Sequence, residues 1–505
     1  MRSEAGVNWI GVSLACAGCG LAALAFGPDA NWDLRNYHLY VAWAWLEDRA
    51  TTDLAAAQAQ SWFNPLPWIP HFVAFQHLGG AALAACIGAL QGLCAAPLLA
   101  LAARLAPDCA LAARMLAVAG GLTAATFLGQ LGASYGDALL AGIALGGVLL
   151  AHDAAARERV DPRRALAAGA LLGAVAALKL SHAPVALGLC FGLPLLAADR
   201  RAAWQLTAWC GAGALAAFVL LAGPWALTLW RDWGNPVFPQ FDALFGGDWI
   251  TQGAARDLRF VPGSATEALS RPLAPLLDWR ATSDYRIRDA RLLLLAVAIG
   301  VLAWRWRAIA PGPRRLLAAL STGFAVAYLL WLPLFGYHRY LVALELAAPL
   351  MLLAASGGHR LALAAIVLCV LSTNPPNHER ATRDWPAGAP VQVALTPGSL
   401  VVMTGDRPTS FVLPFAQGLA SAVRIESNLW DASRPAPGLQ RRAAARLAAH
   451  DGPMVVLLQA DDPAQTDPAL AAYRLARVPD RCTQVATPML PAGEPPLWLC
   501  ELARR

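Results

Sequence analysis

Charge is scarce in this sequence, and lysine is nearly missing from it. Only 14% of the 505 residues are charged, whereas 57% are apolar and the mean hydropathy is +0.47. Soluble domains carry about a quarter charged residues, so this composition excludes an ordinary soluble protein. Several apolar runs approach the roughly 20 residues that cross the hydrocarbon core of a bilayer. The chain is therefore predicted to be an α-helical, polytopic membrane protein.

The apolar runs predict about 11 transmembrane helices. The first run begins at residue 9 and lacks a convincing small-residue cleavage site, so we expect a retained helix rather than a signal peptide. The predicted spans are 9–27, 80–103, 110–128, 136–151, 165–179, 183–198, 203–223, 290–304, 316–334, 340–355 and 360–372.

Positive charge is unevenly distributed among the connections between these spans. By the positive-inside rule, the arginine-rich set of connections is predicted to be cytoplasmic. Residues 28–79, 224–289 and 373–505 then lie outside, and the N-terminus inside. The net charge of +6 reflects this loop bias, so we expect no nucleic-acid partner. The arginines concerned are Arg104, Arg157, Arg159, Arg163, Arg164, Arg200, Arg201, Arg305, Arg307, Arg314, Arg315 and Arg360.

The cysteines give little sign of metal binding. Cys16 and Cys19 form a CxxC inside an apolar run without a second ligand pair, which favours packing over metal binding. Only Cys482 and Cys500 lie in a soluble segment. A disulfide between them is permitted if that segment lies in an oxidising compartment, and the sequence leaves both the paired and the free state open.

The chain changes character near residue 372, which predicts two domains, 1–372 in the membrane and 373–505 outside it. Residues 400–404, 454–459 and 497–502 have the pattern of strands, and 439–450 that of a helix. We therefore expect a small C-terminal α/β domain. It contains no nucleophile motif, phosphate loop or metal-ligand spacing, which favours recognition or positioning over catalysis.

Two external segments are rich in tryptophan and proline. They read QSWFNPLPWIPHF (60–72) and PWALTLWRDWGNPVFPQFDALF (224–245). Amphipathic aromatic segments of this kind anchor in the headgroup region of a membrane. We expect the tryptophans to lie in that interface.

An unusual mixture of ionisable groups follows the first span. Asp33, Arg35, Tyr37 and His38 lie within six residues, in the stretch NWDLRNYHLY. A carboxylate that is hydrated but shielded by aromatic neighbours suits a general base. The alternative is a loop aspartate that only marks the membrane boundary. The acids at 29 and 33 do not form an EF-hand, because Leu34 occupies the position that needs glycine.

Lys179 is the only lysine among 39 basic residues, and His182 follows it in LKLSHAP. Ionisable residues at membrane depth are candidates for function, and a compact ammonium group suits a point contact with phosphate. The alternative is a lysine that reaches the interface from a helix end.

Two further external turns carry polar groups. Asp137 lies in GASYGDAL (132–139). GYHRYLVALE (336–345) carries His338, Arg339 and Tyr340, and Arg339 can pair with phosphate or with an acidic residue. Acids and cations on one face are what a phosphate-bearing substrate at the membrane surface requires.

The order of these motifs resembles the GT-C superfamily of polyprenyl-phosphate-sugar-dependent glycosyltransferases, which includes protein mannosyltransferases and the lipid A aminoarabinose transferase. The motifs WDLRNYHLYVAWAW, QSWFNPLPWIPHF, LKLSHAP, GNPVFPQF and GYHRYLVALE are most similar to uncharacterised bacterial members. The resemblance covers roughly residues 1–350. It implies a bacterial inner-membrane enzyme with a periplasmic active site.

The resemblance also implies roles for individual residues. Asp33 would deprotonate the acceptor hydroxyl, which displaces the polyprenyl phosphate with inversion, while Lys179 and Arg339 neutralise the leaving phosphate. Asp137 occupies the position of an acid that binds metal or acceptor in some relatives. Asp33 lacks the adjacent acid of many relatives, so a divalent metal stays an open expectation. Residues expected to support the site or bind the acceptor are Arg35, Tyr37, His38, Asp137, His182, His338 and Tyr340.

The donor is then a polyprenyl-phosphate sugar, and the acceptor a glycan, a lipid or a protein. One alternative is a transporter or flippase of lipid-linked sugars, which predicts charges in mid-helix and an internal repeat. The other is a non-catalytic scaffold for envelope assembly.

Overall fold

The computed structural model describes residues 8–505 except 157–158, 378, 389, 431–435 and 461–462. The chain forms two compact units, each built from segments that are distant in sequence. The helical unit comprises Met1–Ala25, Ala85–Ala222 and Leu258–His378, and the sheet unit comprises Phe26–Ala84, Gly223–Asp257 and Glu379–Arg505. The sequence predicted a single boundary at residue 372, whereas the sheet unit also takes in residues 26–84 and 223–257.

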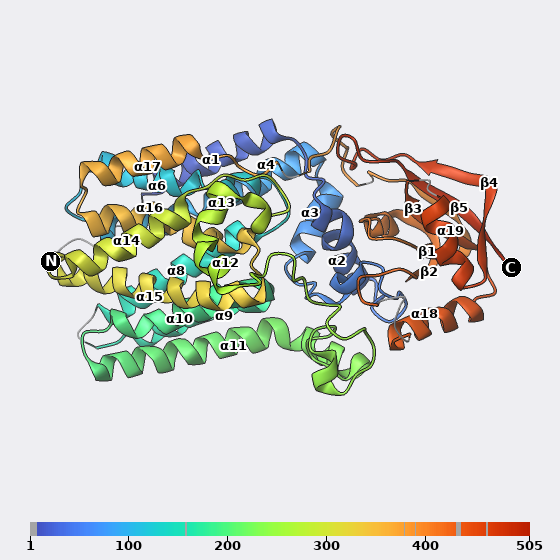
Figure 1. The fold of residues 1–505 in the computed structure, drawn as a ribbon, viewed down its shortest axis with the longest axis horizontal. Coiled ribbons are helices and arrows are strands. Elements are labelled where there is room, and N and C mark those ends of the chain that lie inside the picture. The colour runs from blue at the N-terminus through green and yellow to red at the C-terminus, as the bar shows by residue number, and fades with distance from the viewer. Residues whose placement is uncertain (1–7, 157–158, 378, 389, 431–435, 461–462) are drawn as a thin grey trace. The chain divides into compact units, whose positions relative to one another are not determined.

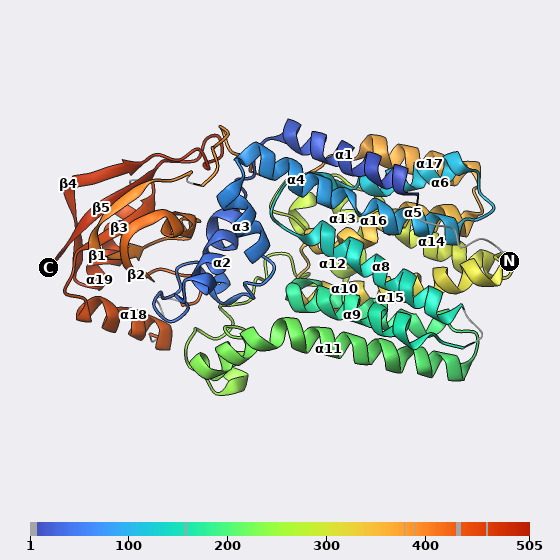
Figure 2. The ribbon, with the colours of Figure 1, turned by 180° about the vertical axis from the view of Figure 1, so that it is seen from behind.

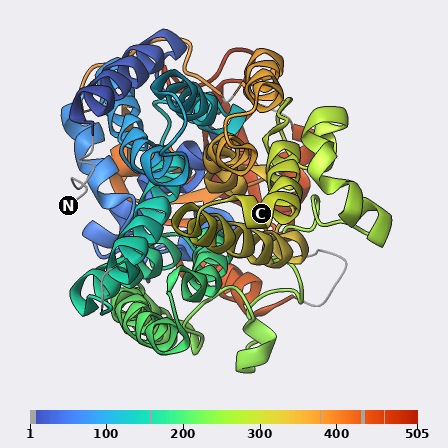
Figure 3. The same ribbon diagram turned by 90° about the vertical axis from the view of Figure 1, so that its left-hand side faces the viewer.

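Long apolar helices run side by side in the helical unit (Figures 1 and 2), and Figure 3 views them from one end. Its principal helices are α1 (Trp9–Phe26), α4 (Gly80–Gly92), α5 (Ala95–Leu105), α6 (Leu111–Leu122), α8 (Asp137–Ala155), α9 (Pro162–Leu178), α10 (Ala183–Gly192), α11 (Arg200–Trp233), α14 (Arg291–Arg305), α15 (Pro311–Leu334), α16 (Val342–Ser356) and α17 (Arg360–Ser372). Helices α4 and α11 cross from one unit to the other. Three short helices follow longer ones along the chain, namely α7 (Ala125–Gly129), α12 (Ala265–Ser270) and α13 (Ala274–Leu277).

Among the residues that the structure describes, six helical segments are long and apolar enough to cross a membrane. They are Trp9–Phe26, Gly80–Leu105, Asp137–Ala155, Arg200–Trp233, Pro311–Leu334 and His338–Ser356, and the shorter apolar helices are Leu111–Leu122, Leu180–Leu196 and Arg360–Ser372. The predicted membrane character is confirmed to that extent, and the predicted number of eleven spans stays a prediction.

The outer helices of this unit expose apolar surface. Only 17% of the apolar stretch of α1 and 11% of that of α11 is buried, against 83% for His338–Ser356. Exposed side chains include Ile10, Trp204 and Leu220. Contiguous apolar surface of this kind is unfavourable in water, and a lipid environment removes the cost.

Paired glycines bring several of these helices into close contact. A Cβ placed on Gly169 or Gly173 of α9 would meet the backbone of α11 at 1.8 or 2.1 Å. Gly188 and Gly192 of α10 face the backbone of α15 in the same way. Both pairs have the G-x-x-x-G spacing, which lets helices approach closely where lipid removes the hydrophobic drive for association.

The sheet unit contains a five-stranded mixed sheet in the order β2-β1-β3-β5-β4 (Figure 1). The strands are β1 (Val393–Met403), β2 (Ala416–Arg424), β3 (Met454–Gln459), β4 (Leu475–Val485) and β5 (Leu497–Arg504), with helices α18 (Gly438–Ala449) and α19 (Pro463–Ala472). Strands β2, β1 and β3 are parallel, and β5 pairs antiparallel with β3 and β4. The predicted strands at 400–404, 454–459 and 497–502 and the helix at 439–450 are confirmed.

Cys482 and Cys500 face each other across β4 and β5 and form a disulfide. The sequence had left this pairing open. Of the cysteines in the described residues, the remaining eight are free.

The tryptophan-rich segments belong largely to the core of the sheet unit. Trp62, Trp225, Trp233 and Phe238 are buried in one cluster with residues of the sheet, and Trp225 Nε1 donates to the carbonyl oxygen of Trp62 at 2.9 Å. The prediction that these tryptophans lie in the membrane interface is therefore wrong for the buried ones. Their apolar area is covered by the protein itself, a contact between segments that composition alone does not reveal.

Buried Arg424, the last residue of β2, links residues 54–58 to this strand through hydrogen bonds. Its guanidinium donates to the carbonyl oxygen of Ala56 at 3.0 and 3.1 Å and to that of Gly405 at 2.6 Å. Burial lowers the pKa of Arg424 to about 10, and nearby Asp406 and Glu426 oppose this shift. The backbone amide of Leu54 also donates to the carbonyl oxygen of Ala422 at 2.8 Å. Residues 26–84 are thus part of the folded sheet unit.

Candidate functional site

The predicted site residues fall into both units, and each group is described within its own unit. Asp33, Arg35, Tyr37 and His38 belong to the sheet unit. The helical unit contains Asp137, Lys179, His182, His338, Arg339 and Tyr340.

The helical unit gathers its candidates where helices begin or end. Asp137 is the first residue of α8, directly after Gly136, whose φ of 75° is left-handed. Lys179 caps the C-terminus of α9 in an extended conformation. Because α8 and α9 pack as consecutive helices, the beginning of one meets the end of the other. Arg339 lies in the short turn between α15 and α16.

We call Asp137, Lys179, His182 and Arg339 the Asp137 cluster. The Asp137 carboxylate is fully buried. Lys179 Nζ donates a short hydrogen bond to Asp137 Oδ1 and another to the carbonyl oxygen of Tyr135 at 2.9 Å. His182 Nε2 lies 2.7 Å from Oδ1, and Arg339 Nε lies 3.2 Å from Oδ2. The structure therefore joins four predicted residues through one carboxylate.

Three tyrosine rings surround the Arg339 guanidinium. Its central carbon lies 4.2 Å from the ring centroid of Tyr135, 5.2 Å from that of Tyr337 and 5.5 Å from that of Tyr340. Lys179 Nζ lies 5.9 Å from the Tyr340 ring. The rings leave only 10% of the Arg339 side chain and 11% of the Lys179 side chain exposed. Both cations are thus partly shielded from water, where electrostatic attraction is strengthened.

The role of Tyr135 was not predicted from the sequence, although it lies two residues before Asp137 in GASYGDAL. The short spacing between Tyr135 and Asp137 could have indicated this role, because two residues so close together at a helix start can border the same site.

His338 points to a different set of groups. Its Nε2 lies 2.5 Å from Glu345 Oε1, and both side chains are buried. Nearby in the same unit, Arg291 Nη1 donates to Asp289 Oδ2 at 2.5 Å, and that oxygen also accepts from the backbone amide of Ala125 at 2.7 Å. His338 is therefore not part of the Asp137 cluster. The sequence analysis missed Glu345, although it lies two helical turns after His338 in the quoted motif.

Asp33 lies at the start of a π-helix in the sheet unit, Leu34–His38. Tyr37 donates a hydrogen bond to Asp33 Oδ2 at 3.4 Å, so these two share a face. The His38 ring stacks on Trp68 with centroids 3.6 Å apart. Single π-turns frequently occur at functional sites.

Arg35 extends away from this face. Its Nη2 lies 2.7 Å from Glu379 Oε2 and 3.9 Å from Glu494 Oε1, and its side chain is fully buried. Burial raises the pKa of Glu379, while the charge of Arg35 opposes that shift. Arg35 thus links residues 26–84 to the C-terminal segment of the same unit, a partnership across 344 residues.

His71 of helix α3 (Ile69–His77) is half-buried with both ring nitrogens shielded from solvent, and it was not predicted from the sequence. Neither ring nitrogen has a hydrogen-bond partner among the described residues. Burial lowers the pKa of His71 to about 4, and the charge of Asp29 opposes the shift. The Asp29 carboxylate accepts from Asn31 Nδ2 at 2.7 Å.

Within the described ranges, no group of three or more His, Cys, Asp or Glu residues is arranged to hold a metal ion. Asp137, the candidate metal ligand, is instead surrounded by Lys179, Arg339 and His182. Cations so close to a carboxylate compete with a metal for its oxygens.

Comparison with known proteins adds no family to this description. No family model, no curated protein and no solved structure matches the chain.

Proposed function

We propose that this chain is an integral membrane glycosyltransferase that moves a sugar from a polyprenyl-phosphate donor to a glycan, lipid or protein acceptor. The observation that carries the proposal is the Asp137 cluster at the ends of apolar helices. Lys179 and Arg339 both approach one buried carboxylate there and remain partly exposed. A lipid-linked phosphate lies at the depth where membrane helices end. Its negative charge can therefore pair with these two cations.

The charges of the cluster favour an anionic ligand. Lys179 and Arg339 contribute two positive charges and Asp137 one negative charge, which leaves one net positive charge when His182 is neutral. Asp137 fixes the two cations, so a phosphate meets donors that are already oriented. Preorganised donors of this kind stabilise developing charge without reorganisation.

In the proposed reaction, the acceptor hydroxyl oxygen attacks the anomeric carbon of the sugar. The bond from that carbon to the phosphate oxygen breaks, and the polyprenyl phosphate leaves with its electron pair. The hydroxyl proton passes to the Asp33 carboxylate, which Tyr37 orients through its hydrogen bond. Lys179 and Arg339 neutralise the leaving phosphate.

The proposed topology has eleven crossings, a cytoplasmic N-terminus, and residues 28–79, 224–289 and 373–505 in the periplasm of a bacterial inner membrane. The Cys482–Cys500 disulfide supports this placement of the C-terminal segment, because disulfides persist mainly in oxidising compartments. A compartment-specific reporter fused after residue 390 tests it. Activity confined to the cytoplasm would overturn the orientation.

The positions of the charged residues also support an enzyme over a transporter. In the candidate spans that the structure describes, Asp, Glu, Lys and Arg lie within five residues of a span end, with the exception of Glu345. A transporter of lipid-linked sugars is expected to carry ionisable groups near the middle of broken helices.

The decisive experiment adds a radiolabelled polyprenyl-phosphate sugar to purified protein and measures transfer or hydrolysis. Asp33→Asn keeps the shape of the side chain but cannot accept the proton. We expect it to bind donor normally and to lose about 10²–10⁴-fold in rate, as general-base removal typically does. Asp48→Asn is the matched control, because Asp48 is an exposed acid of the same external segment. A parental rate in Asp33→Asn would exclude Asp33 as the base.

Donor binding is tested separately through Lys179. Lys179→Ala should weaken donor affinity, and Lys179→Arg should restore part of it, because the charge returns with a different geometry. Unchanged donor affinity in Lys179→Ala would show that Lys179 only pairs with Asp137.

A further inference from the structure

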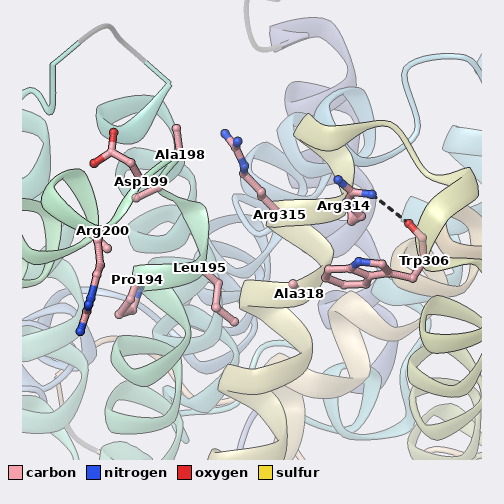
Figure 4. A pocket seen from close by; sticks show the side chains of 11 residues that line it. Pro194, Leu195, Ala198, Asp199, Arg200, Trp306, Arg314, Arg315 and Ala318 are labelled. Atoms are coloured by element: carbon pink, nitrogen blue, oxygen red, sulfur yellow. Dashed lines mark hydrogen bonds between the residues drawn. The ribbon is translucent and has the colours of Figure 1, made fainter.

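A cavity of about 440 Å³ opens at the arginine-rich end of the helical unit. It lies between the segment that leads into α11 and the beginning of α15 (Figure 4). Leu195, Asp199 and Arg200 line one side of it, and Trp306, Arg314 and Arg315 line the other.

This cavity is separate from the Asp137 cluster. Helix α15 begins beside the cavity and ends shortly before Arg339, and its 24 residues span about 36 Å at 1.5 Å per residue. Helix α10 likewise separates His182 from the cavity-lining segment that follows it. The inference below therefore does not depend on the proposed transferase activity.

The arginines give the cavity a strong positive charge. Arg314 Nη1 donates to the carbonyl oxygen of Trp306 at 3.3 Å, and its guanidinium lies over the Trp306 ring at 5.3 Å. Arg200 and Arg315 form no hydrogen bond or ion pair through their side chains with any other residue that the structure describes. Two guanidinium groups are thus available to a ligand, and a third is held in place.

One carboxylate is present, and it is already engaged. Asp199 Oδ1 accepts a hydrogen bond from the backbone amide of Ala202 at 2.9 Å, in the first turn of α11. Three arginines against one aspartate leave a net charge of two positive units at the cavity. The N-termini of two long helices, α11 and α15, add to the positive potential.

The cavity also has an apolar wall. Leu195 and Trp306 each expose 43% of their surface, and Pro194 and Ala318 complete that wall. Guanidinium groups beside exposed apolar side chains match a ligand with an anionic head and a hydrocarbon tail. Basic pockets between membrane helices bind anionic lipid headgroups for this reason.

We propose that this cavity binds the phosphate of an anionic phospholipid. Arg200 and Arg315 donate to the phosphate oxygens, Arg314 on Trp306 completes the positive side, and Leu195 contacts the upper part of an acyl chain. A free phosphate would use the same arginines but would gain nothing from the apolar wall.

The test uses the full-length protein purified in a neutral detergent and titrated with phosphatidylglycerol. Lipid binding is measured by native mass spectrometry and by the shift in thermal unfolding. Parallel titrations use phosphatidylcholine, glycerol 3-phosphate and inorganic phosphate. We expect saturable binding of phosphatidylglycerol and much weaker binding of the other three. Equal affinity for glycerol 3-phosphate or inorganic phosphate would overturn the assignment to a lipid.

Arg200→Gln combined with Arg315→Gln removes the two available charges. We expect this pair of substitutions to weaken phosphatidylglycerol binding about tenfold or more, as the loss of two cations near an anionic headgroup predicts. The matched control is Arg163→Gln combined with Arg360→Gln, which removes the same charge from exposed residues at the same end, outside the cavity. The phosphatidylglycerol affinity of this control variant should stay within about twofold of that of the parent.

An equal loss in both double variants would assign the binding to the general charge of that end and overturn the proposal. Unchanged binding in Arg200→Gln/Arg315→Gln would overturn it as well. Trp306→Leu provides an independent check, because it keeps every charge but releases Arg314. It should weaken lipid binding while leaving the thermal unfolding of the lipid-free protein close to that of the parent.

Discussion

At the scale of single residues, Asp137 is expected to contribute most of the stability of its cluster. Its carboxylate is the shared partner of Lys179, His182 and Arg339. Removing one partner of a buried ion pair typically costs about 3–5 kcal/mol, because a charge is left uncompensated. We therefore expect Asp137→Asn to lower the free energy of unfolding by about that amount, measured by thermal or denaturant unfolding in detergent.

Asp153→Asn is a suitable control for that experiment. Asp153 pairs with Arg104 at the opposite end of α8, and both side chains are about a quarter exposed. Ion pairs that keep contact with water contribute less than buried ones, down to about 0–1 kcal/mol where they are exposed. Adding Lys179→Met to Asp137→Asn should recover part of the stability by removing one unpaired cation. Equal losses for Asp137→Asn and Asp153→Asn would contradict the special role of the cluster.

His71 predicts a loss of stability in mild acid. Burial lowers its pKa to about 4, whereas an unfolded histidine titrates near 6.5. Between these values the unfolded chain binds the extra proton, so stability falls as the pH drops below about 6.5. We expect a loss of about 2 kcal/mol between pH 7.5 and pH 5 from this group.

The measurement compares unfolding of the parent and His71→Phe across that pH range. The variant should lose less stability on acidification, whatever its stability at pH 7.5. Parallel pH profiles for the two proteins would rule out His71 as the titrating group.

At the scale of elements, the paired glycines predict where a methyl group cannot be added. A Cβ on Gly173 would lie 2.1 Å from the carbonyl oxygen of Ala214, so Gly173→Ala must push α9 and α11 apart. We expect a loss of about 1–3 kcal/mol, the usual cost of overpacking. Thermal unfolding of the purified protein measures it.

The control lies in the partner helix of the same contact. Gly211 of α11 has open space around its Cβ position. Gly211→Ala should therefore leave stability unchanged or raise it by up to about 1 kcal/mol through helix propensity. If both substitutions had the same effect, close backbone contact between α9 and α11 could not be its cause.

The elements also show what the sequence could and could not predict. Apolar runs and strand patterns act within one segment, which is why most helices and β1, β3 and β5 were located. Strand β2, with Gly418 and alternate small residues in AQGLASAVR, has too weak an apolar pattern to be recognised. Lys179, His182 and Asp137 were selected because single polar groups between apolar runs are conspicuous.

Partnerships across the chain were beyond such reasoning. Trp225 was expected to lie in the membrane interface, yet it donates to the carbonyl oxygen of Trp62 inside a protein core. Arg35 was expected to support Asp33, yet it pairs with Glu379. The local sequence around Trp225 and Arg35 does not reveal these partners, because the deciding contacts lie 163 and 344 residues away.

At the scale of the whole molecule, the sheet unit depends on segments that interrupt the helical unit in sequence, residues 26–84 and 223–257. Leu54 pairs with Val423 as a parallel bridge at the outer edge of β2, and Arg424 is satisfied there by the carbonyl oxygen of Ala56. Asp53 Oδ1 accepts from the backbone amide of Ala422 at 2.8 Å. Residues 379–505 alone would expose this strand edge and leave the buried arginine without its two hydrogen bonds to Ala56.

We therefore expect a polypeptide of residues 379–505, produced in an oxidising compartment, to aggregate or to unfold without cooperativity. Unpaired strand edges promote association, and a buried polar group without a partner costs about 1–3 kcal/mol. Joining residues 26–84 to this polypeptide through a flexible linker should give a soluble protein with a sharper unfolding transition. Gel filtration and circular dichroism distinguish the two outcomes.

Replacing Leu54 by Pro in the joined polypeptide is the matched control, because it removes the amide that pairs with Ala422 and should return the behaviour of 379–505 alone. Cooperative unfolding of 379–505 by itself would show that the C-terminal segment is an independent domain, as the boundary predicted at residue 372 implies.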